Sequence, residues 1–439
     1  MKKVLILGAG LVAKPMVDYL LSSNETEVTV ASRTVSKAEK LVQGKKSGNA
    51  VQLLVDDDSH LENLIRSNDI CVSLLPYTYH VKVAKLCLKH AKPLVTTSYV
   101  SDAMKALDAK AKEKNLLLLN EIGLDPGIDH MSAMRIIHDV KRRGGEIESF
   151  RSYCGGLPAP GSTDPCCKYK FSWSPRGVLM AGRNNARYLE DDKIIDIPGS
   201  DLFKYHWPIK IDDLNLETYP NRDSLPYIKL YGIPETKTMY RGTLRYPGWS
   251  RTMFAFSKLG FLEEGPITGT KGLTFREITA RIVGSPTAEE VPQHIALRIK
   301  VELNDDILKR MEWLGLLSEE KLDADSITPL DFLASQMLKK LQYGPSERDM
   351  IILYHDFLAK FPDHKERITS TLIDFGEPEG DSSMSRTVSL PAAIAVKLIL
   401  QGKITETGVR IPVTPDIYNP VLKELERLHI VCKENTEVV

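Results

Sequence analysis

The sequence predicts an α/β protein with a doubly wound parallel sheet at its N-terminus, followed by an α+β domain and a small helical subdomain. Three observations predict this architecture. Short apolar runs alternate with helical patterns over the first 130 residues, a glycine-rich turn follows the first of these runs, and the pattern changes after residue 146. The length of 439 residues favours two or three domains, because one core rarely organises more than about 300 residues.

The composition is that of a globular protein, with 42% hydrophobic and 26% charged residues. Lysine plus arginine and aspartate plus glutamate both number 58, which removes the usual electrostatic case for nucleic acid or an anionic membrane as partner. No apolar run approaches the roughly 20 residues needed to span a bilayer. We therefore expect a cytoplasmic protein, and the oligomeric state stays open, with a homodimer as one alternative.

Cysteine and histidine spacing gives no sign of a disulfide framework or a metal site. The six cysteines include no CxxC pair, and Cys166 and Cys167 are adjacent, so reduced thiols are expected. The ten histidines show no metal-ligand spacing, and no metal is expected.

The first 130 residues repeat a strand–helix unit six times. The runs are rich in valine, isoleucine and leucine without alternation, which indicates strands buried on both faces of a parallel sheet. Six units fit a Rossmann dinucleotide-binding domain. The predicted strands are 4–7, 28–31, 51–55, 70–75, 94–97 and 116–119, and the predicted helices are 11–22, 36–43, 59–66, 79–90 and 101–114.

The turn after the first strand has the pattern GxGxxA. Gly8 allows the tight turn, Gly10 lets the backbone approach a pyrophosphate, and the small Ala13 lets the helix pack close to the strand. The predicted contacts with a dinucleotide at this turn are Gly8, Gly10, Leu11, Val12 and Ala13.

The end of the second strand indicates which dinucleotide binds. An NAD site usually has an acidic residue there, but this chain has Ser32, Arg33 and Thr34. A guanidinium and two hydroxyls would bind the 2′-phosphate of NADP(H), which is the predicted cofactor. The alternative is that Arg33 is a solvated loop charge.

Polar or turn-forming residues follow further strand ends, where Rossmann folds bind ligands. Prolines and glycines around Asp125 indicate a rigid loop that fixes this carboxylate near the nicotinamide, although Asp125 could instead cap the next helix. The candidate residues are Leu75, Pro76, Tyr77, Thr97, Ser98, Tyr99, Leu124, Asp125 and Pro126.

After residue 146 strand-like segments come with few helices and with loops rich in glycine and proline, which indicates an α+β substrate domain. Residues 131–264 and 346–389 are predicted to form it. Residues 265–345 are predicted as a helical subdomain, and 390–439 as a return to the first domain.

Three residues of this second part are candidates for substrate chemistry. Arg222 and Arg245 would bind carboxylates bidentately, with solvated charges or structural ion pairs as the alternative. Cys154 precedes a flexible glycine pair at a strand end, with a buried small hydrophobe as the alternative.

Taken together, these motifs resemble the saccharopine reductase family, the NADP-dependent, L-glutamate-forming saccharopine dehydrogenases. The resemblance covers essentially the whole chain, and 200–215 and 265–345 diverge most. It rests on GxGxxA with 32–34 and on the strings at 74–77, 120–130, 152–160, 170–174, 219–224 and 241–246.

The resemblance implies an active site between a Rossmann and a substrate domain. It also implies the reaction, in which allysine (2-aminoadipate 6-semialdehyde) condenses with glutamate and NADPH reduces the imine to saccharopine. By the family's pattern, saccharopine would contact Ser98, Tyr99, Asp125, Arg222, Thr243, Leu244 and Arg245. Pro175 would join Gly10 to Ala13, Ser32 to Thr34, Leu75 to Tyr77, Thr97 and Leu124 to Pro126 along the cofactor.

Imine formation and hydrolysis need proton transfers, and the hypothesis is that Asp125, Cys154 and Tyr99 carry them as catalytic residues. Two alternatives stay open. An imine reductase of the carboxynorspermidine type would handle a diamine product, which suits two carboxylate-seeking arginines less well. A non-catalytic NADP-binding scaffold would have lost its polar cleft residues.

Overall fold

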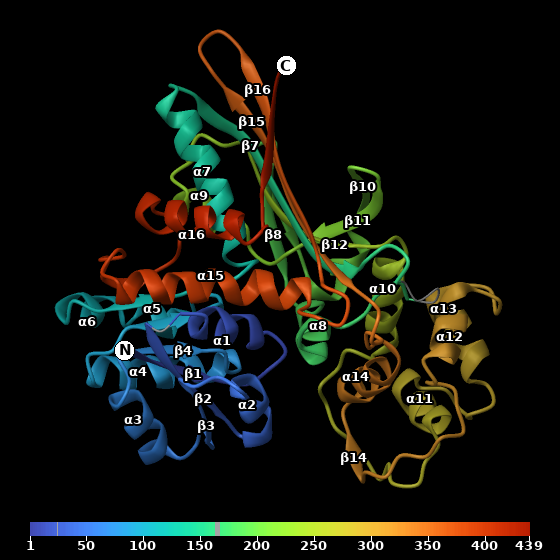
Figure 1. Cartoon of the computed structure of the whole chain (residues 1–439). Coiled ribbons are helices and arrows are strands. Elements are labelled where there is room, and N and C mark those ends of the chain that lie inside the picture. The colour runs from blue at the N-terminus through green and yellow to red at the C-terminus, as the bar shows by residue number, and fades with distance from the viewer. Residues whose placement is uncertain (24, 163–166) are drawn as a thin grey trace. The chain divides into compact units, whose positions relative to one another are not determined.

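The structure, a computed structural model, describes residues 1–23, 25–162 and 167–439, so the predicted reduced thiol Cys166 lies outside the described residues. The chain splits into two compact units. The first comprises Met1–Ile147 and Ala359–Val439, and the second comprises Glu148–Leu358 (Figure 1). The residues predicted as a helical subdomain, 265–345, lie in the second unit, and the predicted three-part division stays a prediction.

A seven-stranded sheet forms the centre of the first unit. Its order is β17-β6-β5-β4-β1-β2-β3, and neighbouring strands pair in parallel. The predicted doubly wound parallel sheet is confirmed. The strands are β1 (Lys2–Leu7), β2 (Thr26–Ser32), β3 (Gly48–Gln52), β4 (Ile70–Ser73), β5 (Leu94–Thr96), β6 (Leu117–Leu119) and β17 (Gly408–Arg410).

Two strands of this sheet differ from the prediction. The apolar residues Leu53, Leu54 and Val55 predict the third strand at 51–55, but β3 pairs over 48–52, and Leu53 enters the core after the strand has ended. The seventh strand, β17, comes from the C-terminal part of the chain and pairs with β6. Its three residues, Gly408, Val409 and Arg410, contain one large apolar side chain, so no apolar run marks this strand in the sequence.

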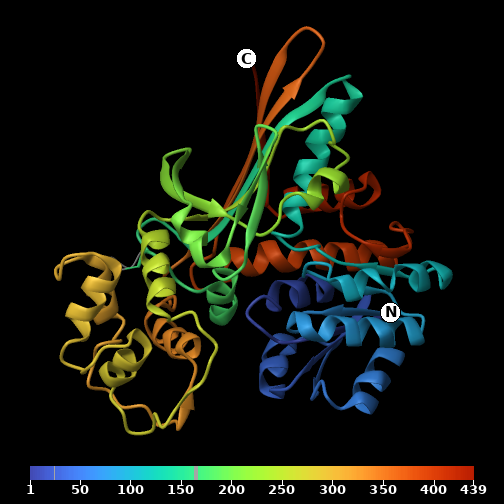
Figure 2. The ribbon, with the colours of Figure 1, turned by 180° about the vertical axis from the view of Figure 1, so that it is seen from behind.

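Helices cover both faces of the sheet (Figures 1 and 2). One continuous core joins the strands to α3 (Asp58–Arg66), α4 (His80–Lys89), α5 (Asp102–Lys105) and α6 (Asp108–Glu113). The opposite face carries α1 (Lys14–Leu21), α2 (Val35–Val42) and α15 (Ser383–Leu400).

The segment predicted as one helix over 101–114 forms the two helices α5 and α6. The interruption has a tertiary cause, because the carboxylate of Asp108, at the start of α6, accepts a hydrogen bond of 2.9 Å from the backbone N–H of Val409 in β17. A contact between residues 301 positions apart leaves no local signal in the sequence.

The C-terminal segment of the first unit also packs on α7 (Ile128–Arg142). Arg135 of α7 bridges Glu426 at 2.9 Å and Glu434 at 2.7 Å, which belong to α16 (Pro415–Arg427) and β18 (Lys433–Val438). Strand β18 pairs antiparallel with β16 (Lys365–Phe375). Helix α15 has the length and composition of a membrane span, but 72% of its apolar window is buried within the structure, as in a core helix.

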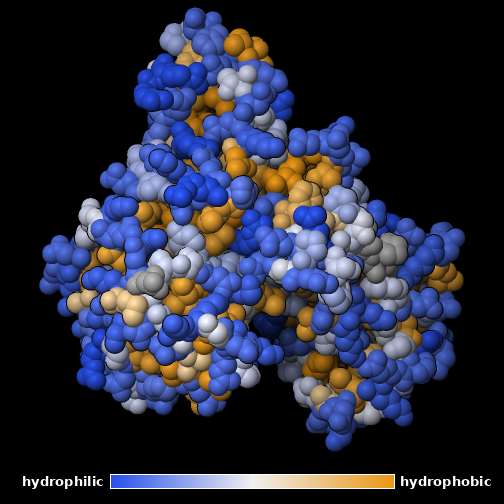
Figure 3. All heavy atoms as spheres, viewed as in Figure 1, coloured by the Kyte–Doolittle hydropathy of each residue, from blue (hydrophilic) through white to orange (hydrophobic). Residues whose placement is uncertain are grey.

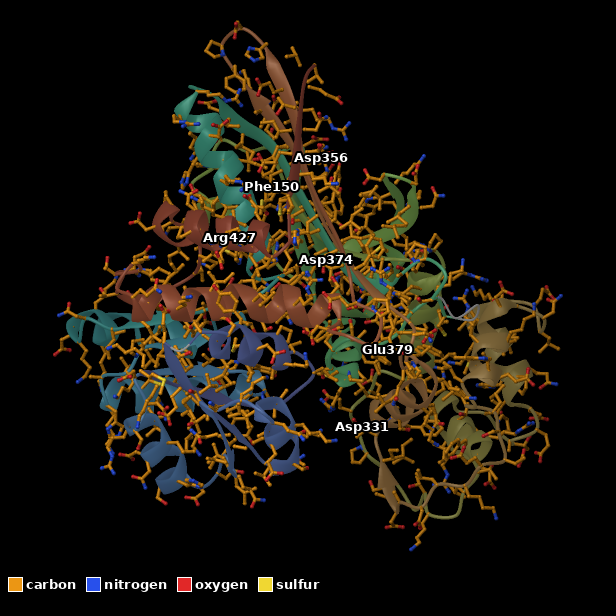
Figure 4. The ribbon with its side chains drawn as sticks, in the orientation of Figure 1. Phe150, Asp331, Asp356, Asp374, Glu379 and Arg427 are labelled. Carbon is orange, nitrogen blue, oxygen red and sulfur yellow. The ribbon has the colours of Figure 1, made fainter. Side chains whose placement is uncertain are left out.

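A mixed sheet forms the second unit, with β10-β11-β12-β7-β15 in order and β8 and β9 beside β12. Strands β7 and β12 are parallel, whereas β11 runs antiparallel to β12. Phe150 of β7, labelled in Figure 4, stacks on Phe357 of β15 with ring centroids 4.3 Å apart. The strands are β7 (Glu146–Pro158), β8 (Ala186–Glu190), β9 (Lys193–Ile197), β10 (Trp207–Ile211), β11 (Leu214–Pro220), β12 (Thr238–Arg245) and β15 (Asp349–Lys360).

Helices predominate between β12 and β15, as the sequence predicts. Asp331, labelled in Figure 4, lies in the first turn of α14, where its backbone N–H donates to the capping hydroxyl of Thr328. On the face drawn in Figure 3, hydrophobic residues are scattered among hydrophilic ones. The helices between β12 and β15 are α10 (Trp249–Leu259), α11 (Phe275–Val283), α12 (Val291–Ile299), α13 (Asp306–Trp313) and α14 (Pro329–Lys340), and α8 (Pro175–Ala181) and α9 (Pro226–Leu230) precede β12.

Candidate active site

The predicted cofactor residues of the first unit gather at one edge of its sheet. Strand β1 lies between β2 and β4, so the chain leaves the central strand in opposite directions on its two sides. Open α/β sheets bind ligands outside the carboxyl ends of their strands at such a switch point. The predicted residues follow the carboxyl ends of β1, β2, β4, β5 and β6.

The glycine turn after β1 is shaped for an anion. Gly8 has φ +113°, and a Cβ there would lie 3.0 Å from the carbonyl oxygen of Leu74, so this position requires glycine. A Cβ on Gly10 would meet no atom within 4 Å, which leaves open space above the backbone. Helix α1 starts beyond Ala13 without a side-chain cap, so the N–H groups of its first turn, apart from Pro15, which has none, can bind a phosphate.

The ends of β2 and β3 present a cation and an apolar surface together. Arg33 and Thr34 are exposed, and the Arg33 carbonyl accepts a hydrogen bond from Gln52 at the end of β3. Leu54 follows β3 and is 58% exposed. In the sequence Leu54 falls within the strand predicted at 51–55, and an apolar residue in such a run indicates core rather than ligand.

Exposed apolar side chains recur among the predicted cofactor residues. Leu11 is 68% exposed and Tyr77, directly after Leu75 and Pro76, is 76% exposed. Val12 and Thr97 are half-buried. Large apolar groups on one rim of a sheet are expected where a ligand with flat rings is covered on binding.

The loop after β6 fixes Asp125 against Tyr99. The Tyr99 hydroxyl donates to the Asp125 carboxylate at 2.7 Å. Gly123 donates to the carbonyl of Pro126, and Gly127 has φ +150° with room for no side chain, because a Cβ would lie 2.0 Å from the Gly123 oxygen. Asp125 does not cap the helix that follows, because the N-cap of α7 is Gly127 and no side chain caps this helix.

A buried pair of side chains, Glu121 and His130, supports this loop. Glu121 accepts from the backbone N–H of Val100 at 2.8 Å, and its other oxygen lies 2.8 Å from Nε2 of His130. Glu121 has φ +56°, and His130 is fully buried. Glu121 therefore connects the Tyr99 segment to the Asp125 loop, a contact that only the folded backbone reveals.

In the second unit, Cys154 lies on β7 opposite Thr243 of β12 and is 9% exposed. The two strands approach closely at this point, because a Cβ on Gly155 would lie 2.7 Å from the carbonyl oxygen of Leu244. The glycine that follows Cys154 thus serves strand packing. Thr243 is half-buried and Leu244 is fully buried.

Arg245 occupies an aromatic site that the sequence does not show. Its guanidinium carbon lies 4.9 Å from the ring centre of Tyr169 and 5.5 Å from that of Trp249. One guanidinium N–H donates to the carbonyl of Leu244 at 2.7 Å, whereas Nε has no hydrogen-bond partner among the described residues. A buried cation with an unused donor is suited to a carboxylate.

Arg222 differs from Arg245 in exposure and place. It is exposed, with φ +56°, and it follows β11, whose last residue Pro220 lies opposite Gly242. Arg245 lies opposite Glu217, which is three residues before Pro220 in β11. The positions of Glu217 and Pro220 are therefore roughly 10 Å apart along the strand. The two arginines therefore suit two separate anionic groups better than one.

Pro175, the predicted cofactor residue of the second unit, is half-buried at the start of α8. Ser174 caps this helix by accepting from the N–H of Gly177. The preceding Trp173 is 36% exposed.

Comparisons with known proteins show which family has these features. Residues 4–119 match the family model described as the saccharopine dehydrogenase NADP binding domain, and residues 123–430 match that of the saccharopine dehydrogenase C-terminal domain. Saccharopine dehydrogenase [NADP(+), L-glutamate-forming] of Saccharomyces cerevisiae is 40% identical over 99% of both chains. The enzyme of the same name from Pyricularia oryzae is 41% identical over 99% of this chain and 98% of that one.

A longer relative and a solved structure agree with these matches. The mitochondrial alpha-aminoadipic semialdehyde synthase of mouse is 38% identical over the whole of this chain, which covers 48% of that protein. The solved structure of the apo saccharopine dehydrogenase (L-Glu forming) from Saccharomyces cerevisiae aligns over 100% of both chains with a TM-score of 0.89 and 39% identity. The predicted NADP cofactor and dehydrogenase class are confirmed. The chain belongs to the saccharopine dehydrogenase family.

Proposed function

We propose that this chain joins 2-aminoadipate 6-semialdehyde to L-glutamate and reduces the resulting imine to saccharopine with NADPH, reversibly, in lysine metabolism. In the reductive direction the glutamate amine attacks the aldehyde carbon and water leaves. A hydride then reaches the imine carbon, and a proton completes the secondary amine. The observation that carries the proposal is the 40% identity to a glutamate-forming dehydrogenase over 99% of both chains.

The edge of the first sheet is proposed to hold the cofactor, which supplies the hydride when bound. The open space at Gly10 and the uncapped start of α1 fit its pyrophosphate. Arg33 and the hydroxyl of Thr34 would bind the 2′-phosphate, and the exposed Leu54 would pack on the adenine. Tyr77, which follows β4 on the other side of β1, adds a further apolar surface.

The Tyr99–Asp125 pair is proposed to move protons during carbinolamine formation and dehydration. Asp125 is half-buried and takes a 2.7 Å hydrogen bond from Tyr99, so it is oriented before substrate binds. A positioned acid–base group typically contributes about 10²–10⁴-fold to the rate. Cys154, as a further proton carrier, stays a hypothesis.

Substrate recognition in the second unit is assigned to the two arginines. Saccharopine carries three carboxylates, and Arg222 lies beyond the end of β11 whereas Arg245 pairs with Glu217 inside that strand, so the two arginines suit groups at different ends of such a chain. Thr243 and Leu244 would contact the ligand beside Arg245.

Product analysis tests the reaction against the diamine alternative. Purified protein is incubated with NADPH and 2-aminoadipate 6-semialdehyde plus glutamate, or with aspartate 4-semialdehyde plus a diamine. Mass spectrometry of the products should find saccharopine in the first mixture alone. A carboxylated diamine product at the higher rate would reject the proposed substrate class, and NADPH binding without product in either mixture would support a scaffold.

The proposal includes a cytoplasmic location and a homodimer. Fractionation of cells and light scattering of the purified protein test them. Recovery of the protein in the organelle fraction, or a monomeric mass, would correct either part without touching the reaction.

A further inference from the structure

His80 joins two strand ends of the candidate active site. It is the first residue of α4 and is 4% exposed, although the Pro76–Tyr77 segment just before it is exposed. Its Nδ1 lies 2.9 Å from the hydroxyl of Ser73, the last residue of β4. Its Nε2 lies 2.8 Å from the hydroxyl of Ser98, which follows β5.

Both ring nitrogens therefore have partners, and the three groups within hydrogen-bond distance of them are hydroxyls. The third is Thr96 of β5, whose hydroxyl lies 3.3 Å from Nε2. Ser73 and Thr96 are fully buried, so two of the three partners are fixed in the core. Ser98 is half-buried, so the orientation of its hydroxyl depends on the hydrogen bond to the His80 ring.

The ring is neutral in the working pH range. Burial lowers the pKa of His80 to about 4. A neutral imidazole has one donor and one acceptor nitrogen, so it can link two hydroxyls in one defined tautomer. With a pKa of about 4, the ring is not an imidazolium near pH 7 and so is a poor general acid for a reaction at that pH.

The segment that Ser98 begins leads directly to the proposed proton-transfer pair. The Ser98 carbonyl accepts from the N–H of Glu121 at 3.1 Å, and the next residue is Tyr99, which binds Asp125. A displaced Ser98 would displace Tyr99. Misplacement of a reacting group by about 1 Å costs on the order of 100-fold in rate.

We propose that His80 is a positioning residue that fixes the Ser98 hydroxyl and thereby holds Tyr99 beside Asp125. The inference rests on the proposed function, because it takes Ser98, Tyr99 and Asp125 as parts of the active site.

Two substitutions separate the two ends of the ring. In His80→Asn the side-chain amide reaches the position of Nδ1 and keeps a hydrogen-bond partner for Ser73. In His80→Gln the longer side chain places its amide at the position of Nε2 and keeps a partner for Ser98. We expect kcat for saccharopine oxidation to fall roughly 10- to 100-fold in His80→Asn and less than about 5-fold in His80→Gln. The control is His90→Gln on the same helix, where His90 contacts Glu62, and it should leave kcat unchanged.

Ser98→Ala completes a double-mutant cycle. His80→Asn should add less than about 2-fold to the loss caused by Ser98→Ala alone, because the two changes remove the same contact. The pH dependence of kcat should keep its inflections in His80→Asn. The proposal would be overturned if kcat fell equally in His80→Asn and His80→Gln, or if the losses of kcat from His80→Asn and Ser98→Ala multiplied in the double variant. Loss of an inflection from the pH dependence of kcat in His80→Asn would also overturn it.

A measurement without turnover keeps this inference separate from the proposed reaction. Nitrogen NMR of ¹⁵N-histidine-labelled protein, with the His80 signals identified by their loss in His80→Asn, should show a neutral ring at pH 6–8 whose Nε2 signal shifts in Ser98→Ala. An unshifted Nε2 signal would refute the His80–Ser98 contact. Wild-type protein that binds NADPH but leaves saccharopine unchanged would instead refute the reaction.

Discussion

Replacing Gly10 by alanine should weaken NADPH binding and leave the fold intact. The added Cβ meets no protein atom within 4 Å, and the backbone of Gly10 lies outside the left-handed region, so no strain arises. An alanine at a compatible position stabilises a protein by about 0.4–1 kcal/mol through the unfolded chain. The same methyl group occupies the space through which a pyrophosphate would approach the backbone.

The magnitude follows from the contacts that the methyl group displaces. A hydrogen bond between an amide and a charged group contributes about 1.5–3 kcal/mol. Loss of one such bond raises the Kd for NADPH roughly 10- to 150-fold. Fluorescence titration gives the Kd, and urea denaturation gives the free energy of unfolding.

Gly8→Ala is the matched control two residues away. Gly8 has φ +113° and a Cβ there would lie 3.0 Å from the Leu74 oxygen, so this variant should lose about 1–3 kcal/mol of stability. Unchanged NADPH affinity in Gly10→Ala would refute the placement of the pyrophosphate. A stability loss in Gly10→Ala as large as in Gly8→Ala would refute the structural reasoning.

Four further substitutions test other parts of the account. Arg33→Ala should lower the preference for NADP over NAD by about 10-fold in kcat/KM, since one charge-assisted contact is lost. Tyr99→Phe should reduce kcat about 10- to 100-fold with unchanged Kd for NADPH, because the hydrogen bond from the Tyr99 hydroxyl to Asp125 disappears. Arg222→Ala, at an exposed position, should raise the KM for saccharopine with an unchanged melting temperature. Arg143 holds the pKa of Glu366 below its usual 4.5, so Glu366 stabilises the fold above that pH and loses this contribution as the pH falls; Glu366→Gln should flatten the acid limb of the stability curve.

Each of these substitutions has an outcome that contradicts its reasoning. An unchanged NADP preference would make Arg33 a solvated loop charge. Full activity of the Tyr99 variant would leave proton transfer to other groups. A lowered melting temperature on loss of Arg222 would show a structural ion pair, and an unchanged acid limb would show that Glu366 is not linked to folding.

The sequence predicted the nucleotide-binding half well because its signals are local. Valine- and leucine-rich runs, the glycine pair at 8 and 10 and the proline–glycine loop around Asp125 each carry their meaning within a few residues. The parallel sheet that they predicted is present, and the differences are the ends of several elements, the added strand β17 and the division of the 101–114 helix into two.

The remaining features depend on contacts between distant residues. Strand β17 joins the sheet from position 408, and Asp108 interrupts a helix by binding Val409. The aromatic pair around Arg245 joins the nearby Trp249 to the distant Tyr169, which no spacing rule connects to Arg245. Residues so far apart in the sequence leave no periodic or capping signal, so these contacts are visible only in the folded structure.

The most direct test of the central claim is the absorbance of the reduced nicotinamide when purified protein is mixed with saccharopine and either NADP or NAD. The account predicts reduction of NADP, much faster than of NAD, with glutamate and 2-aminoadipate 6-semialdehyde as products. Tight binding of NADP with no absorbance change in the presence of saccharopine would contradict it.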